Sequence, residues 1–382
     1  MTWHDQTVFV TGATGFIGGR ICERLVLAGT GQVRALVHSP HKAARIARLP
    51  IELVRGSLLD RESLRSALGS AKIVIHCGLG NARGIVRGTE NLLTVAADAG
   101  VERFIHMSTA AVYGLTPPPG SETEDAPVRA TGDNYCDNKG RAERVVARFG
   151  RQGMGTVILR PSIVYGPYSA WSTRLVHNLR QNIVALIDGG RGACNTVYVD
   201  NLIDAIFLAA ANEAAAGGTF FVTDGEAITW GEFIQAHVAM LGRTDALPEI
   251  SRTQVLAHYK QRPGLLRGSV TATAQALRSR QFRQLLMQIP LTQRVLSGAW
   301  DWLESLPEDQ REWVRSRLGV RRPATIEQAA TPIPDEVDFA TQTGSVFFRI
   351  DKARKILGYE PRVPFRQGTA LVEQWMRHAN YI

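Results

Sequence analysis

The sequence is short of cysteine and has no long apolar run. Its four cysteines, in 382 residues, form no C-x-x-C pair; they are Cys22, Cys77, Cys136 and Cys194. This scattering favours a reduced, cytoplasmic protein over one held together by disulfides or a zinc ion, so we expect no metal site. No apolar run approaches the ~20 residues of a membrane-spanning helix. The first residues lead directly into a predicted strand, so we expect no signal peptide.

Acidic residues are absent from residues 250–300, which carry eight basic residues, whereas the whole chain has a net charge of +9. The charge therefore characterises this segment and not the fold. Within it, Phe282, Leu285, Leu286 and Ile289 recur at helical spacing, which predicts an amphipathic helix over residues 275–289, ending before Pro290.

Three interpretations of the basic helical segment 250–306 remain open. It could cap a substrate cleft while its basic face stays in solvent. It could bind an anionic group of the substrate, such as a phosphate. Residues 275–306 could also make peripheral membrane contact, because basic residues, tryptophan and low net hydrophobicity suit an interfacial helix. We expect no nucleic-acid partner, because no recognition motif accompanies the charge.

The composition of the whole chain, 45% hydrophobic and 21% charged, is that of an ordinary soluble protein. The most informative stretch of the sequence is T-V-F-V-T-G-A-T-G-F-I-G, which begins at Thr7. A β-branched run predicts a strand, and the apolar spacing after Phe16 predicts a helix. Gly12, Gly15 and Gly18 lie between the two, where a dinucleotide diphosphate can rest on helix N–H groups.

Predicted strands alternate with predicted helices along the first part of the chain. The strands are residues 7–10, 33–37, 51–54, 73–76, 104–108, 156–159, 196–199 and 220–223. This alternation predicts an α/β fold with a doubly wound parallel sheet (Rossmann) and a smaller, largely helical C-terminal substrate-binding region. We expect a dinucleotide-binding core at 1–245, with substrate-side segments near 165–195, and the C-terminal region at 246–382.

The end of the second strand bears on the choice of cofactor. A carboxylate there would bind the ribose hydroxyls of NAD, and a basic group would suit the 2′-phosphate of NADP. His38 and Lys42 follow the strand, with Arg45 beyond and no acid between. Both NAD and NADP remain candidates, with NADP slightly favoured. Alternatively, Lys42 and Arg45 belong to a solvated helix face.

Tyr135 and Lys139 lie four residues apart at the start of a predicted helix, so their side chains share one face. A nearby ammonium lowers the pKa of a phenol, so we expect Lys139 to lower that of Tyr135 and make it a proton carrier. Thr109 follows the fifth strand, where a ligand of a parallel sheet would meet its hydroxyl.

These motifs, with R-P-S-I-V-Y-G-P from Arg160, V-Y-V-D-N from Val197 and the ending around residues 352–361, resemble the extended short-chain dehydrogenase/reductase superfamily in its epimerase/dehydratase branch. The resemblance covers about residues 1–240 and 346–378. It implies that Tyr135 exchanges a proton with the substrate oxygen, that Lys139 tunes it and contacts the nicotinamide ribose, and that Thr109 orients the substrate. It also implies a homodimer paired through helices near 88–99 and 135–149.

The resemblance assigns further residues to the site. Those expected at the cofactor are Gly12, Thr14, Gly15, Phe16, Ile17, Gly18, His38, Lys42, Ser57, Leu58, Cys77, Gly78, Tyr135, Lys139, Pro161 and Ile163. Those expected at the small-molecule substrate are Ser108, Thr109, Tyr113, Ser162 and Asn195.

Some family positions carry different residues here. Ala110 and Ala111 replace the acid pair of family dehydratases, which argues against 4,6-dehydration. Ile163 stands where sugar-nucleotide enzymes often have an Asn that contacts the substrate pyrophosphate. We therefore expect hydride transfer at a secondary alcohol or ketone, with a sugar or sugar nucleotide as the favoured substrate of an epimerase or ketoreductase. The alternative is a 3β-hydroxysteroid dehydrogenase-like enzyme of a lipid or other apolar carbonyl. A non-catalytic dinucleotide-sensing protein is a third reading, against which the intact Tyr135 and Lys139 argue.

Overall fold

The computed structural model describes residues 5–78, 84–261 and 331–382. The chain forms two units, one of Met1–Arg252 with Pro334–Ile382 and one of Thr253–Ile333. The C-terminal chain returns to the first unit, where Asn201 Oδ1 accepts the backbone N–H groups of Arg362 and Val363, both at 3.0 Å. The division into a dinucleotide-binding core at 1–245 and a substrate-binding region at 246–382 stays a prediction.

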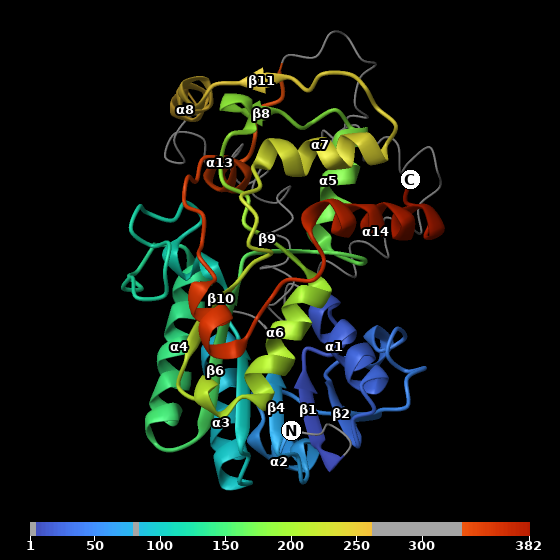
Figure 1. The fold of residues 1–382 in the computed structure, drawn as a ribbon, viewed down its shortest axis with the longest axis vertical. Coiled ribbons are helices and arrows are strands. Elements are labelled where there is room, and N and C mark those ends of the chain that lie inside the picture. The colour runs from blue at the N-terminus through green and yellow to red at the C-terminus, as the bar shows by residue number, and fades with distance from the viewer. Residues whose placement is uncertain (1–4, 79–83, 262–330) are drawn as a thin grey trace, which may run out of the picture. The chain divides into compact units, whose positions relative to one another are not determined.

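A seven-stranded sheet forms the centre of the first unit, in the order β10-β6-β5-β4-β1-β2-β3 (Figure 1). Every neighbouring pair is parallel. The strands are β1 (Thr7–Thr11), β2 (Gln32–Val37), β3 (Glu52–Arg55), β4 (Ile73–His76), β5 (Arg103–Met107), β6 (Gly155–Pro161) and β10 (Thr219–Val222). The predicted doubly wound parallel sheet is confirmed.

Helices cover both faces of this sheet. Val8 and Val10 of β1 belong to one buried cluster, with residues of α1 (Phe16–Leu27) and α6 (Val199–Ala211). Phe9 faces the other way, into a cluster with residues of α2 (Arg61–Leu68), α3 (Thr89–Asp98) and α4 (Asn134–Arg151). This alternation is what a strand buried on both faces requires, because successive side chains point to opposite sides.

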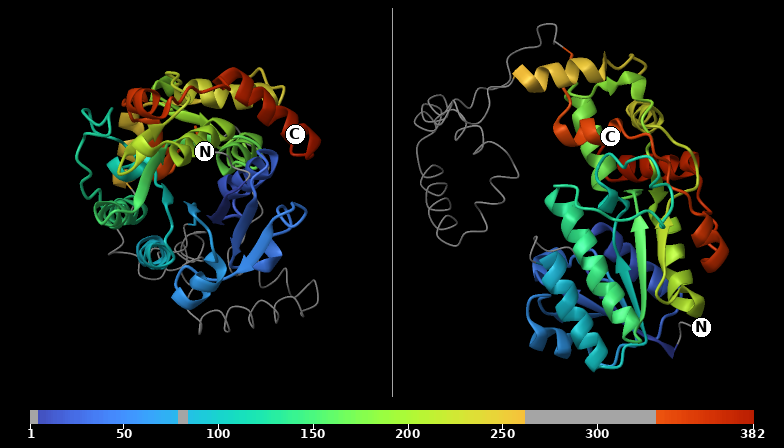
Figure 2. Two further views of the ribbon diagram at one scale, coloured as in Figure 1. Left: turned by 60° about the horizontal axis from the view of Figure 1, so that its bottom comes forward. Right: turned by 90° about the vertical axis from the view of Figure 1, so that its left-hand side faces the viewer.

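Smaller elements gather beyond the carboxyl ends of the sheet strands (Figures 1 and 2). Two short parallel pairs form there: β7 (Ile163–Tyr165) with β9 (Thr196–Tyr198), and β8 (Leu186–Ile187) with β11 (Glu249–Ile250). Four helices accompany them: α5 (Ala170–Arg180), α7 (Trp230–Met240), α13 (Glu336–Gln342) and α14 (Phe365–His378). The segment near 165–195 that was predicted to lie on the substrate side thus contributes α5 and β8.

The second unit is described at its two ends, where α8 (Arg252–Gln261) leads into it. The predicted basic helix at 275–289 lies outside the described residues, so all three interpretations of the basic segment stay predictions. In the part of the chain that the structure describes, no helix has the length and apolar character needed to cross a membrane.

Candidate active site

The glycine turn between β1 and α1 has the tight geometry that the sequence predicts. Gly12 has a φ of 70°, and a Cβ built on it would lie 2.7 Å from the carbonyl carbon of Cys77. A Cβ on Gly18 would lie 2.2 Å from the Gly12 oxygen. Real side chains do not tolerate such contacts with backbone, so both positions require glycine.

The first turn of α1 suits an anion. Its N-cap, Gly15, provides no side-chain cap, and the first turn contains no acidic residue. Backbone N–H groups at such a helix end carry partial positive charge and bind phosphate oxygens. The residues present thus fit a dinucleotide diphosphate, which Gly12, Gly15 and the first turn of α1 would hold.

Three predicted cofactor loops meet at the point where the strand order reverses, between β1 and β4. Cys77 N–H donates to the Thr11 carbonyl at 3.2 Å, and Gly78 N–H donates to Thr11 Oγ1 at 3.1 Å. The Leu58 side chain lies against Gly78, 2.9 Å from a Cβ built there. Open parallel sheets bind ligands in this crevice. The topology therefore brings Gly12, Cys77, Gly78 and Leu58 to one place.

The basic residues after β2 differ in how they are engaged. The Arg45 guanidinium pairs with Glu23 at 3.0 Å and lies 4.1 Å from the centre of the Tyr168 ring. Lys42 is exposed in a single helical turn over Pro40–Lys42. His38 is also exposed, with Nδ1 at 3.2 Å from Ser39 Oγ. Arg45 is thus bound by the protein, whereas Lys42 and His38 face solvent.

Lys139 is 3% exposed and donates a 2.6 Å hydrogen bond to the Met107 carbonyl at the end of β5. It lies on the first part of α4, whose N-cap Asp133 accepts the Cys136 N–H at 2.8 Å. Burial lowers the pKa of Lys139 to about 8, although the nearby Glu143 raises it. The ammonium form is therefore retained at neutral pH.

The expectation that Lys139 lowers the pKa of Tyr135 is wrong for this structure. Removal of the phenol from water raises the pKa of Tyr135, even though 41% of the residue is exposed. The contact that opposes this effect is a side-chain hydrogen bond with Thr109. The Lys139 ammonium is directed instead at the Met107 carbonyl. Tyr135 is therefore a protonated phenol at neutral pH, beside the hydroxyl of Thr109.

A cavity of about 240 Å³ opens next to Tyr135 and Thr109. Ser162, Ile163 and Asn195, which were predicted from the sequence, also line it. The walls carry no charged side chain among the described residues; the lining is completed by Ala110, Ala111, Gly114, Leu115, Pro117, Trp171, Ala193, Trp230, Val337, Thr341, Gly344, Val346 and Phe348. The cavity suits an apolar ligand with one polar end.

Two predicted substrate residues do not line this cavity. Ser108 is 5% exposed, and its hydroxyl donates to Glu143 at 2.5 Å. The Tyr113 hydroxyl donates to the Ala126 carbonyl at 3.0 Å and accepts from Arg160 at 2.7 Å. Both hydroxyls are therefore hydrogen-bonded to groups within the protein.

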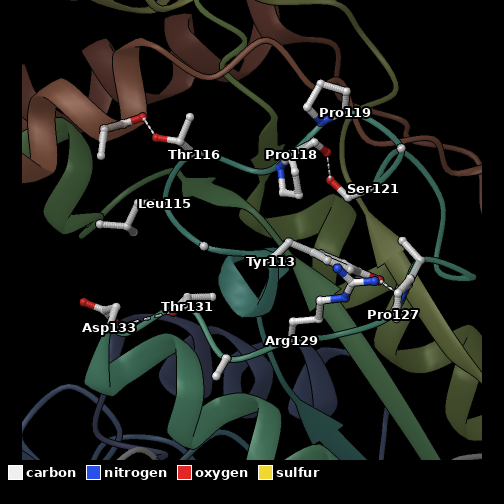
Figure 3. A pocket seen from close by; sticks show the side chains of 15 residues that line it. Tyr113, Leu115, Thr116, Pro118, Pro119, Ser121, Pro127, Arg129, Thr131 and Asp133 are labelled. Atoms are coloured by element: carbon white, nitrogen blue, oxygen red, sulfur yellow. Dashed lines mark hydrogen bonds between the residues drawn. The ribbon is translucent and has the colours of Figure 1, made fainter.

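Tyr113 also belongs to a second hollow of about 640 Å³, formed mainly by residues between 113 and 133 (Figure 3). Gly114 and Leu115 line both spaces. The Thr116 hydroxyl donates to the Ala340 carbonyl at 2.7 Å, which ties this loop to α13. The loop at 113–133 thus forms this hollow and also one side of the cavity beside Tyr135.

The sequence motifs did not identify part of the cavity wall. Trp171 of α5 and Trp230 of α7 have ring centres 5.8 Å apart, and the chain at 337–348 closes another side. No local motif marks these residues as cavity residues, because long-range packing brings them together. The sequence shows only that they are aromatic or aliphatic, which predicts burial but not a place in the cavity wall. Among the described residues, no group of His, Cys, Asp or Glu side chains could hold a metal ion.

Comparison with known proteins identifies the family to which the chain belongs. The model of the NAD dependent epimerase/dehydratase family matches residues 8–222, and the chain belongs to this family. A 4-hydroxy-2-methyl-3-oxo-4-farnesyl-3,4-dihydroquinoline-1-oxide ketoreductase of Stigmatella aurantiaca is 31% identical over 59% of this chain and 70% of its own.

Two further proteins show the range of the similarity. A 3-beta-hydroxysteroid dehydrogenase of Mycolicibacterium neoaurum is 26% identical over 95% of this chain and 89% of its own. The UDP-glucose 4-epimerase of Thermotoga maritima, solved with UDP-glucose, shares the fold with a TM-score of 0.67 and 17% identity, over 98% of this chain and 99% of its own. The chain is therefore an oxidoreductase of this family.

Proposed function

We propose that this protein is an NAD(P)-dependent ketoreductase of an apolar carbonyl compound. The observation that carries the proposal is the uncharged cavity beside Tyr135 and Thr109. Of the two substrate classes that the sequence left open, the cavity favours the apolar carbonyl over the sugar nucleotide. A sugar diphosphate would need cationic groups or many donors, and the described walls offer few polar atoms.

The protonation states support reduction. A reduced nicotinamide supplies a hydride when it is bound. Tyr135 is a protonated phenol at neutral pH, so it donates a proton to the carbonyl oxygen as negative charge develops there. The Thr109 hydroxyl holds that oxygen close to the phenol. Lys139 retains its ammonium at neutral pH and would contact the nicotinamide ribose, as the family resemblance implies.

Two residue choices and two relatives add support. Ile163 and the Ala110–Ala111 pair line the cavity, in place of the Asn and the acids expected of sugar-nucleotide enzymes and dehydratases. The ketoreductase and the hydroxysteroid dehydrogenase among the relatives are named for apolar substrates.

NADP is slightly favoured over NAD, because Lys42 is exposed after β2 and no acid lies between residues 38 and 42. A homodimer paired through α3 and α4 stays part of the proposal.

The test is a substrate panel with NADPH or NADH. We expect turnover of apolar cyclic or long-chain ketones and none of UDP-glucose. The variant Tyr135→Phe, which lacks only the phenol hydroxyl, should lose at least about a hundredfold in kcat, the lower end of what general acid catalysis contributes. Its cofactor affinity should not change. Turnover of UDP-glucose with no ketone reduced would refute the proposal, and full activity of Tyr135→Phe would refute the mechanism.

A further inference from the structure

Four-residue spacing on α4 places a third residue, Glu143, in line with Tyr135 and Lys139. Tyr135, Lys139 and Glu143 recur at this interval, so they share one face of the helix. Glu143 is 6% exposed. A carboxylate at that depth is stable only when its oxygens are paired. The mechanism proposed above does not use it.

Both oxygens of Glu143 are bound. Arg160 Nε donates to Glu143 Oε1 at 2.9 Å, and Arg160 Nη2 donates to Oε2 at 2.7 Å. Oε1 also accepts the Ser108 hydroxyl at 2.5 Å. The carboxylate therefore joins three elements: α4, the end of β5 and β6. Ser108 directly precedes Thr109, so this contact fixes the backbone from which the Thr109 hydroxyl reaches Tyr135.

Glu143 also supplies the charge that acts on Lys139. The other titratable groups that influence Lys139 or feel its charge are His76 of β4, Cys77 after it, and His106 of β5. Burial lowers the pKa of His76 to about 3 and that of His106 well below its ordinary value, and it raises the pKa of Cys77 to about 12. All three are neutral near pH 7. Of the described groups that act on Lys139, Glu143 alone then carries a charge.

We infer that Glu143 is a positioning residue for the proposed reaction: held by Arg160, it anchors Ser108 and thereby Thr109 against α4, and its charge keeps Lys139 an ammonium. This inference rests on the proposed function.

The direct test is a titration of the lysine side chains by NMR in the full chain, which needs no substrate. The sequence has only six lysines: Lys42, Lys72, Lys139, Lys260, Lys352 and Lys355. The one with the lowered pKa is assigned with Lys139→Arg. We expect Lys139 to titrate near pH 8 in the natural protein and at least about one pH unit lower in Glu143→Gln. The alkaline limb of the kcat profile should move to lower pH by the same amount.

Asp224→Asn is the matched control. Asp224 is 5% exposed and accepts from Tyr198 N–H and Asn201 Nδ2 at 2.8 and 2.7 Å, but it does not act on Lys139. Its substitution should alter stability without moving the Lys139 titration. If Lys139 titrates unchanged in folded Glu143→Gln, or moves equally in Asp224→Asn, the inference is wrong. A shift of Lys139 without turnover of any ketone would refute the proposed function and leave the effect of Glu143 on Lys139 intact.

The variant Glu143→Asp keeps the carboxylate charge on a side chain that is one methylene shorter. We expect the Lys139 titration to stay near pH 8 and kcat to fall about tenfold or more, because Ser108 and Thr109 lose their anchor. This variant keeps a carboxylate to pair with Arg160, so it tests the positioning role of Glu143 even if Glu143→Gln does not fold. Natural kcat at every pH in Glu143→Asp would overturn the positioning role.

Discussion

The Asn195 carboxamide holds Phe348 in the wall of the cavity beside Tyr135. Its Oδ1 accepts the Phe348 backbone N–H at 2.8 Å, and its Nδ2 donates to the Val346 carbonyl at 2.9 Å. Asn195 was predicted to contact the substrate. In the structure it lines the cavity, but both ends of its side chain are occupied by the C-terminal return of the chain.

Asn195→Ala should therefore loosen the wall of the cavity. Each buried backbone group that loses its partner costs about 1–3 kcal/mol, so we expect a measurable fall in the free energy of unfolding and a higher KM for an apolar ketone. Urea denaturation and steady-state kinetics measure the two effects. Asn178→Ala is the control, because within the described chain the Asn178 side chain makes no hydrogen bond. Equal behaviour of the two variants would contradict this role.

The glycine turn can be tested with two positions of nearly equal φ. Gly12 has a φ of 70° and Gly100 one of 68°, but a Cβ on Gly12 meets the Cys77 backbone, whereas a Cβ on Gly100 meets nothing within 4 Å. Gly100→Ala should cost only the strain of the left-handed conformation, about 1–2 kcal/mol. Gly12→Ala should cost clearly more and abolish cofactor binding. Similar losses in both variants would mean that the close approach at Gly12 is unimportant.

The apolar character of the cavity predicts a strong penalty for a charge at Ala111, which lines it. Ala111→Glu should raise the KM for an apolar ketone by about tenfold or more, because a buried carboxylate without partners is costly. Ala111→Gln has the same shape without the charge and should have a smaller effect. An unchanged KM in the Glu variant would show that the ketone binds elsewhere.

The exposed side chain of Lys42 predicts the direction of cofactor preference. Lys42→Glu should weaken NADPH binding about tenfold, the value of one charge-assisted hydrogen bond, and leave NADH binding nearly unchanged. Lys355→Glu makes the same charge change at an exposed position of the C-terminal return. Calorimetric titration with both cofactors compares the variants. Equal loss of both cofactors would argue against a role for Lys42 at the 2′-phosphate.

The fold could be predicted because its signals are local. Apolar runs and glycine turns marked the strands, and their alternation with helices set the parallel topology. The four-residue spacing of Tyr135 and Lys139 likewise placed both on one helix face. The convergence of Gly12, Cys77 and Gly78 followed from the topology, since all three follow strands at the same edge of the sheet.

The errors at the site have physical causes. Ser108 and Thr109 are neighbours after an extended strand, so their side chains point to opposite sides and only one reaches the cavity. The effect of Lys139 on the pKa of Tyr135 depends on the direction of the ammonium group. The hydrogen bond to the Met107 carbonyl sets that direction, and no sequence pattern indicates it. The sequence left the substrate class open, and our proposal of an apolar substrate rests on Trp171, Trp230 and Phe348, which only tertiary packing brings together.

The central claim is that a hydride passes from a reduced nicotinamide to an apolar ketone in this cavity. The most direct measurement uses NADPH and NADH carrying deuterium at the transferable C4 position, with apolar ketones and UDP-glucose as separate substrates, and mass analysis of the products. We expect one deuterium on the new carbinol carbon of the ketone product in the natural enzyme and none with Tyr135→Phe. Deuterium-free ketones together with epimerised UDP-glucose would contradict the account.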